Sequence, residues 1–159
     1  MNMSFGGVNA YSQAAAAEVA QSQQVYGIAM IASAGNEGTY IENVFSANQP
    51  GVIGVGSNDD GNTRSAFSTR GPHVDIMAPG HYVLGARRNA DGGGYVFVKG
   101  TSFSAPTVAG CVALMYDKGL SLSQVRSRLF THANDMGPAG YDTATGHGYM
   151  NCRRSLDPN

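Results

Sequence analysis

A short, unbroken apolar run at residues 28–32, Ile-Ala-Met-Ile-Ala, constrains the fold of this chain more than any other feature. A strand with one wet face alternates apolar and polar residues, whereas a strand covered on both faces is apolar throughout. Residues 51–56 form a second short apolar stretch of the same kind. The two stretches predict an α/β fold in three layers, with a parallel sheet flanked by helices.

Three helices are predicted around this sheet. Residues 11–26 are rich in alanine and glutamine, with apolar residues at four-residue spacing, and this helix is expected to end at Gly27. Residues 104–118 carry charges only at their end, which predicts a helix buried for most of its length. Residues 122–132 are amphipathic, and Ser121 is the expected N-cap.

Short strands are expected at residues 74–77, 82–86 and 95–98. Residues 91–94, Asp-Gly-Gly-Gly, form a strong turn signal that predicts a hairpin from the last two strands. The sequence contains no internal repeat and no linker that would divide its 159 residues, so we interpret it as part of one domain.

The composition argues against several classes of protein. A net charge of −1 without a basic block gives no sign of a nucleic-acid surface. No apolar run approaches the roughly 20 residues that span a bilayer, so no membrane partner is expected. Cys111 and Cys152 have neither CxxC nor metal-ligand spacing. We expect two buried or half-buried free thiols, with a disulfide between them as the alternative.

Residues 100–110, Gly-Thr-Ser-Phe-Ser-Ala-Pro-Thr-Val-Ala-Gly, carry the strongest chemical signal. A glycine after a predicted strand permits a sharp turn, which places Ser102 at the mouth of an apolar helix. Free backbone N–H groups and a partial positive charge at that position would stabilise an oxyanion. Pro106 is expected in the first helical turn, where its missing N–H does no harm. A lone serine here would be a helix cap, but the full string resembles the nucleophile motif of the subtilisin family of serine proteases.

Two further segments resemble this family in the same chain order. Residues 34–38, Ala-Gly-Asn-Glu-Gly, resemble its oxyanion-hole loop, which implies that the Asn36 amide and the Ser102 backbone N–H bind the oxyanion. Residues 3–7, Met-Ser-Phe-Gly-Gly, resemble the strand that pairs with the substrate backbone. The resemblance implies two walls of a substrate site, formed by Ser4, Phe5 and Gly6 and by Ser33, Ala34 and Gly35.

The resemblance covers residues 2–156 and implies that residues 1–159 are the C-terminal portion of a single subtilisin-like peptidase domain. The implied fold is a partial three-layer sheet flanked by helices, with a C-terminal hairpin and helices. The family's catalytic aspartate and histidine precede the Met-Ser-Phe-Gly-Gly strand, so we expect that N-terminal part to be absent. The histidines of this chain match neither position, and each is interpreted as a surface or packing residue: His73, His81, His132 and His147.

A serine without a base is a weak nucleophile, so the chain alone is expected to be inactive. Its open edge strand and uncovered apolar surface also predict poor stability unless a second segment completes the sheet.

Two functions remain in competition. The first is a serine-type endopeptidase that cleaves polypeptide substrates through an acyl-enzyme on Ser102, with the N-terminal segment of the same domain as its partner. The second is a non-catalytic subtilase remnant that binds peptides or other partners. An α/β-hydrolase is set aside because Ser104 stands where the nucleophile elbow needs glycine. By resemblance, the chemistry needs no cofactor. The resemblance also implies a structural calcium ion, although the sequence shows no evident ligand cluster. It further implies secretion, although no signal peptide is visible.

Overall fold

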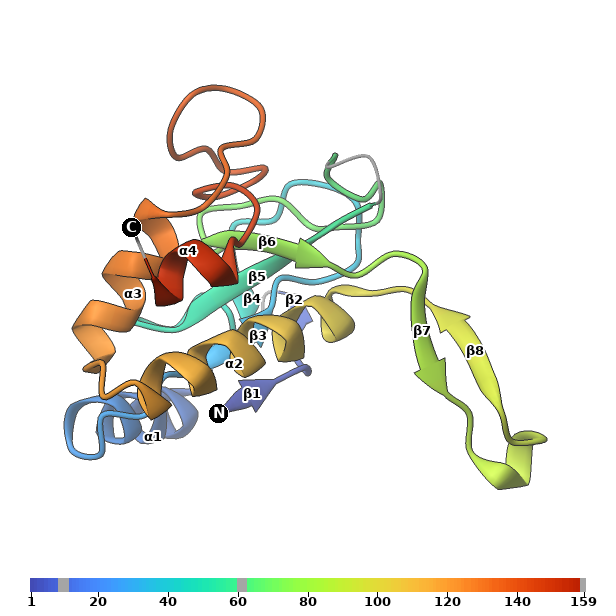
Figure 1. Ribbon diagram of the computed structural model, residues 1–159, viewed down its shortest axis with the longest axis horizontal. Helices are drawn as coiled ribbons and strands as arrows, with labels where there is room; N and C mark the ends of the chain where they lie inside the picture. The colour runs from blue at the N-terminus through green and yellow to red at the C-terminus, as the bar shows by residue number, and fades with distance from the viewer. Residues whose placement is uncertain (9–11, 60–62, 158–159) are drawn as a thin grey trace.

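The computed structural model describes residues 1–8, 12–59 and 63–157. Its centre is a four-stranded parallel sheet (Figure 1). The strands run in the order β1 (Asn2–Met3), β3 (Ile31–Ser33), β5 (Ile53–Asn58) and β6 (Ile76–Pro79). The predicted parallel α/β sheet is therefore confirmed, although each of its three predicted strands begins two or three residues later than expected.

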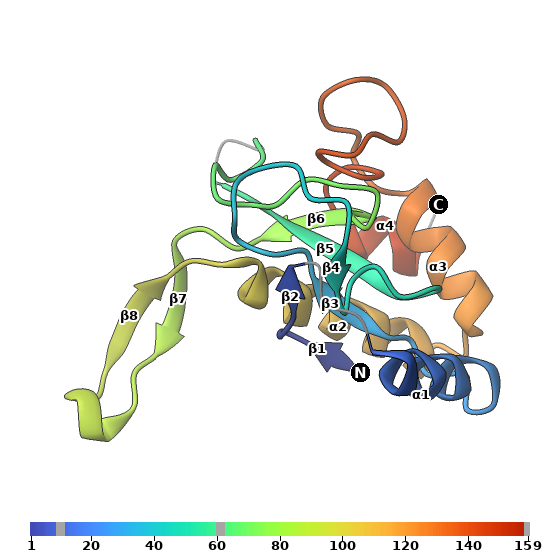
Figure 2. The same cartoon turned by 180° about the vertical axis from the view of Figure 1, so that it is seen from behind.

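Both faces of the sheet are covered, as the apolar runs predicted. Ile31 and Ile53 point into a core cluster formed with the helices α2 (Thr101–Asp117), α3 (Leu122–Thr131) and α4 (Cys152–Leu156). The neighbouring residues Ala32 and Val52 point the other way, into a second cluster with Val19 of α1 (Gln13–Gln24). Figure 1 shows α2 in front of the sheet, and the reverse view in Figure 2 shows α1 in front. Alternate residues of one strand thus serve two cores, so the whole strand is apolar.

The helix boundaries correct several expectations. In α1, Ser12 is the N-cap and its hydroxyl accepts a hydrogen bond from the Ala15 N–H at 3.3 Å. Tyr11, the expected start, lies outside the described residues. In α3, Ser121 is the N-cap, as predicted, and it also forms a capping box with Gln124. The outer side of α2 is open, because Leu114 is 54% exposed, so the prediction of a largely buried helix holds only for the side that faces the sheet.

The α2 helix begins at Thr101, three residues before the expected start. Ser102 is therefore the second residue of the helix, and Pro106 is its sixth. Pro106 lies in the second turn and not in the first, where we expected it. Its missing N–H leaves the carbonyl four residues earlier without a helical partner, and that carbonyl belongs to Ser102.

The predicted hairpin is present, formed by the antiparallel strands β7 (Val83–Ala86) and β8 (Tyr95–Val98). Its turn contains a short 3₁₀ helix, Asn89–Asp91. The hairpin projects from the body at the end of α2 that carries Ser102 (Figures 1 and 2). The sequence analysis expected a C-terminal hairpin, but the hairpin precedes α2 in the chain. The C-terminal part consists of the helices α2, α3 and α4.

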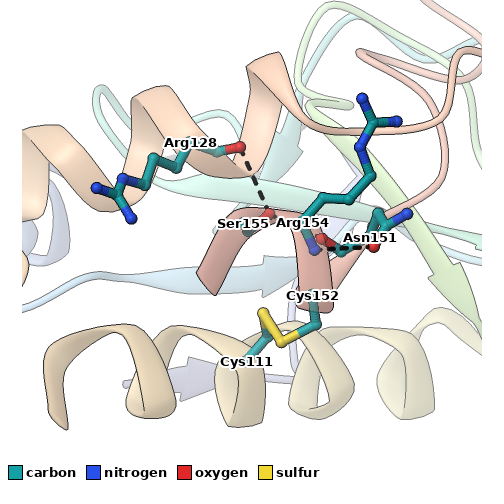
Figure 3. Close-up of a disulfide and its surroundings, with 6 residues drawn as sticks. All are labelled: Cys111, Arg128, Asn151, Cys152, Arg154 and Ser155. Carbon is teal, nitrogen blue, oxygen red and sulfur yellow. Dashed lines mark hydrogen bonds between the residues drawn. A yellow bond between two sulfur atoms is a disulfide. The ribbon is translucent and has the colours of Figure 1, made fainter. Parts of the chain in front are cut away.

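Cys111 and Cys152 form a disulfide, so the expectation of two free thiols was wrong. The two residues are 41 positions apart in the sequence, but α4 packs beside α2 and brings their Cα atoms to 5.7 Å (Figure 3). The Ser155 hydroxyl of α4 donates to the Arg128 carbonyl of α3 at 3.4 Å, which fixes α4 on its other side. Spacing along the chain could not reveal this pairing, because it depends on how three helices pack.

Candidate active site

Ser102 is positioned by a sharp turn between β8 and α2. Gly100 at this turn has φ +146°, a conformation that residues with a side chain rarely adopt. The Gly100 N–H donates to the Gly80 carbonyl at 2.8 Å, so the turn is tied to the end of β6. Ser102 follows within the first helical turn, where backbone N–H groups have no partner inside the helix. Its own N–H is thus a free donor beside its hydroxyl.

The side chain of Asn36 is oriented by Thr101. Its Oδ1 atom accepts from the Thr101 backbone N–H at 2.9 Å and from the Thr101 hydroxyl at 3.0 Å. The same hydroxyl lies 3.3 Å from the Gly35 N–H, which donates to it. Since Oδ1 is held in this way, the Nδ2 amide is the end of Asn36 that remains as a donor. Thr101 is completely buried, and the sequence analysis missed its role although it is part of the nucleophile motif.

Ser4 connects the predicted substrate strand to Ser102, the predicted nucleophile. Its hydroxyl donates to the backbone carbonyl of Ser102 at 3.0 Å. This is the carbonyl that Pro106 leaves without a partner in the helix, so Ser4 satisfies an acceptor that α2 cannot. The contact joins two residues that are 98 positions apart and aligns the edge of the sheet with the first turn of α2.

These residues surround one cavity of about 250 Å³. Seven of the eight predicted site residues line it: Ser4, Phe5, Gly6, Ser33, Gly35, Asn36 and Ser102. Four residues that were not predicted for the site also line it: Gly7, Val8, Glu37 and Val44. Ala34 is the exception. It is fully buried behind the wall, where its carbonyl faces the Nε2 atom of His73 at 3.0 Å.

A further part of the cavity lining comes from a small antiparallel pair, β2 (Gly7–Val8) with β4 (Val44–Phe45), through Gly7, Val8 and Val44. Gly6 approaches this pair so closely that a Cβ atom at its position would lie 1.9 Å from the Phe45 carbonyl oxygen. Only glycine fits there. The Ser46 hydroxyl donates to the Phe5 carbonyl at 2.9 Å, which fixes the backbone beside Gly6.

Comparison with known proteins decides the family. A family model described as the subtilase family matches residues 1–148. The chain belongs to the subtilase family.

Named relatives agree with this assignment. Subtilisin-like protease 1 of Arthroderma gypseum is 39% identical over 145 residues, which are 87% of this chain and 28% of the relative. Subtilisin-like protease 1 of Trichophyton rubrum is 41% identical over 132 residues, which are 81% of this chain and 25% of the relative. The subtilase chain described here therefore spans about a quarter of the length of these relatives.

Solved structures show the same fold. The Prenylagaramide maturation protease PagA superimposes with a TM-score of 0.83 at 27% identity, over 98% of this chain and 60% of that chain. A lanthipeptide protease gives a TM-score of 0.83 at 25% identity, over 99% of this chain and 60% of that chain. The subtilase fold expected from the sequence is thus confirmed.

None of the four histidines lines the cavity of this subtilase. His147 stacks on Phe130 with ring centroids 4.6 Å apart, and His132 caps the end of α3. His81 lies against Tyr82 at 4.2 Å. Among the described residues, the Ser102 hydroxyl has no hydrogen-bond partner. The two residues predicted as nucleophile and oxyanion donor, Ser102 and Asn36, thus line a cavity that no histidine of the chain reaches.

His73 has the most constrained environment of the four. Burial lowers the pKa of its imidazole, and the hydrogen bond to the Ala34 carbonyl opposes this shift. That bond requires a proton on Nε2, which leaves Nδ1 buried without a partner among the described residues. A second proton would therefore place a charge where no acceptor receives it. Neutral His73 supports the wall that carries Ser33 and Gly35.

Two acidic residues, one in the cavity and one in the interior, have defined hydrogen-bond partners. Glu37 lines the cavity and accepts from the Thr69 hydroxyl at 2.5 Å. Asp75 is a buried carboxylate, whose pKa is raised by burial and lowered in part by the Gly54 N–H that it accepts at 2.8 Å. Across residues 1–8, 12–59 and 63–157, no group of three or more histidine, cysteine, aspartate or glutamate side chains could hold a metal ion. The expected calcium ion stays a prediction.

No helix in the part of the chain that the structure describes is long and apolar enough to cross a membrane.

Proposed function

We propose that this chain carries the nucleophile and the oxyanion hole of a subtilisin-like serine endopeptidase. The observation that carries the proposal is that Ser102 and Asn36 line one cavity, while Thr101 holds Asn36 with its amide donor free. A scissile carbonyl beside the Ser102 hydroxyl would meet this amide and the Ser102 backbone N–H. Two donors aimed at one oxygen are the arrangement that stabilises a tetrahedral intermediate in acyl transfer.

The reaction would proceed in two steps. The Ser102 oxygen attacks the peptide carbonyl while a base takes its proton, and the oxyanion accepts hydrogen bonds from Asn36 and from Ser102. The intermediate expels the amine, which receives the proton, and an acyl-enzyme forms on Ser102. Water then attacks the ester and releases the acid. The residue before the scissile bond would occupy the 250 Å³ cavity, with Phe5 and Glu37 among its lining residues.

The base must come from outside the described residues, because no histidine reaches the cavity. Loss of the serine or of the histidine from subtilisin, a member of the same family, costs about 10⁶-fold in kcat. We therefore expect the isolated chain to be inactive. An N-terminal segment of a subtilase domain, with the family's aspartate and histidine, would supply the base.

Three open surfaces support such a partner. The strand β1 is an edge of the sheet, and a parallel edge strand is normally covered. An apolar cavity of about 370 Å³ lies beside it, with Met3, Phe5 and Val19 in its lining. The outer side of α2 exposes Leu114. A segment that pairs with β1 and packs over α2 would bury all three.

A fluorophosphonate probe tests the proposal, because it reacts only with an activated serine. The isolated chain should not be labelled, whereas the chain mixed or co-expressed with an N-terminal subtilase segment should be labelled at Ser102. Ser102→Ala should abolish the label, and Asn36→Ala should slow it by about 10²-fold or more, a magnitude known from subtilisin itself. Absence of labelling in a stable complex of the two segments would contradict the proposal.

The alternative is a non-catalytic subtilase remnant that binds peptides through the same cavity. A binding module has no chemical need for the Ser102 hydroxyl or for an oriented Asn36 amide, which favours the endopeptidase. The alternative predicts no labelling with or without the added segment, and unchanged peptide binding in Ser102→Ala.

The disulfide supports secretion of the protein. Disulfides persist in oxidising compartments and are rare in the cytosol. Cys111 and Cys152 are bonded here, and Cys111 is 3% exposed. We infer a secreted protease that acts on polypeptides outside the cell. Fractionation of the producing organism would test this inference, and recovery of the reduced protein in the cytosol would contradict it.

A further inference from the structure

A second, aromatic cavity lies where the β7–β8 hairpin leaves the body. Its volume is about 230 Å³, and its lining consists of His81, Tyr82, Phe97, Val98 and Lys99. The ring of Tyr82 lies 4.2 Å from that of His81 and meets Phe97 edge-on at 6.4 Å. Tyr82 is 64% exposed and Phe97 is 66% exposed, so both rings present apolar surface to solvent. The proposed chemistry uses none of these residues.

The backbone at this cavity is unusual. Tyr82 has φ +55°, and it is the one non-glycine residue in the left-handed region within the described parts of the chain. Bulky residues rarely adopt this conformation, and such positions cluster at ligand clamps and active sites. Tyr82 belongs to neither wall of the 250 Å³ cavity, so that cavity does not explain it.

The aromatic cavity adjoins the nucleophile. Lys99 is three residues before Ser102, so their Cα atoms are at most about 11 Å apart. The Gly100 N–H to Gly80 carbonyl bond of 2.8 Å ties the residue before His81 to the same turn. Both ribbon views show the hairpin leaving at the end of α2 that carries Ser102 (Figures 1 and 2). The two cavities share no lining residue and reach this turn from separate segments.

The aromatic cavity carries a positive charge from Lys99 and no negative charge in its lining. Lys99 is exposed, and no carboxylate of the described residues lies within ion-pair distance of it. Arg88 lies at the turn end of the hairpin, outside the lining of the cavity, and is paired with Asp91 at 3.0 Å. No acidic residue lines the cavity. A ligand with an aromatic ring and a carboxylate would meet both the ring surface and the ammonium group.

We propose that this aromatic cavity binds the substrate on the C-terminal side of the scissile bond and selects an aromatic residue adjacent to an acidic one. This inference rests on the proposed endopeptidase function. If the residue before the scissile bond fills the 250 Å³ cavity, the other half of the peptide would run past Ser102 toward Lys99 and the aromatic cavity. An extended chain covers about 11 Å in roughly three residues. Because about 11 Å is the largest separation of the two Cα atoms, the selected pair lies within about three residues after the bond that is cleaved.

Peptide binding to the Ser102→Ala chain tests this proposal without turnover. The probe is an eight-residue fluorescein-labelled peptide with adjacent phenylalanine and glutamate, measured by fluorescence anisotropy. Control peptides replace the phenylalanine with alanine or the glutamate with glutamine. Phe97→Ala should weaken binding about tenfold, as expected for an aromatic anchor. Tyr95→Ala is the matched control, because Tyr95 is 77% exposed on the same hairpin but does not line the cavity.

Lys99→Gln provides a second variant that alters only an exposed side chain. It should weaken the glutamate peptide about two- to fivefold and leave the glutamine peptide unchanged. Wild-type affinity in both Phe97→Ala and Lys99→Gln would overturn the proposal, as would an equal loss in Tyr95→Ala. Failure of Ser102 labelling alongside Phe97-dependent binding would contradict the endopeptidase but support the cavity. Ser102 labelling without Phe97-dependent binding would support the endopeptidase but contradict the proposal for the aromatic cavity.

Discussion

The Cys111–Cys152 disulfide allows a prediction whose size follows from the structure. The bond closes a loop between residues 41 positions apart, and it joins the helix that carries Ser102 to the C-terminal helix α4 (Figure 3). In the chain-entropy treatment, a loop of this length restricts the unfolded chain by about 4 kcal/mol at 25 °C. For a chain of this size, each kcal/mol corresponds to about 2–4 °C in Tm, so reduction should lower Tm by about 8–16 °C.

The assay is thermal unfolding followed by circular dichroism, with and without a phosphine reductant. A Cys111→Ala/Cys152→Ala variant separates the contribution of the cross-link from that of sulfur packing in the core. The reduced wild type keeps both sulfurs in the core and loses only the cross-link, whereas the variant also loses packing around the buried Cys111, worth about 1 kcal/mol. The variant should therefore unfold slightly below the reduced wild type. A reduced protein that melts within 2 °C of the oxidised one would refute the loop-entropy reasoning.

Three further predictions concern the support of the active site. Thr101→Val should destabilise the chain by about 1–3 kcal/mol, because it removes the hydroxyl that donates to Asn36. Thr101→Ser keeps a hydroxyl and should cost less. Equal urea midpoints for the two variants would contradict this prediction. Ser4→Ala should cost about 1 kcal/mol in urea unfolding, since the Ser102 carbonyl loses its partner, and an unchanged midpoint would argue against it. Burial lowers the pKa of His73 from 6.5, so the folded state binds fewer protons than the unfolded state. Its stabilising contribution is present above pH 6.5 and lost as the pH falls through the lowered value. His73→Gln should flatten the loss of Tm between pH 7 and pH 5, and identical pH profiles would show that another group is responsible.

The sequence alone predicted those features that depend on residues adjacent in the chain. The apolar run before Ser33 predicted a strand buried on both faces, because every residue of such a strand meets a core. The string from Gly100 to Gly110 predicted a turn followed by a helix, because glycine and proline act on the backbone locally. Seven of the eight residues predicted for the site line one cavity, since the strand ends and loops that carry them lie at one edge of a parallel sheet, and their roles stay a prediction.

Contacts between distant parts of the chain were decided only by the tertiary structure. Thr101 and Asn36 are 65 positions apart, and no local pattern shows that one orients the other. Ala34 lies behind the cavity wall, because it packs in a core cluster with Val74, Met77 and Met136. The disulfide depends on the packing of α4 beside α2. Local patterns determine which elements form, whereas the direction and partner of a side chain follow from how those elements pack.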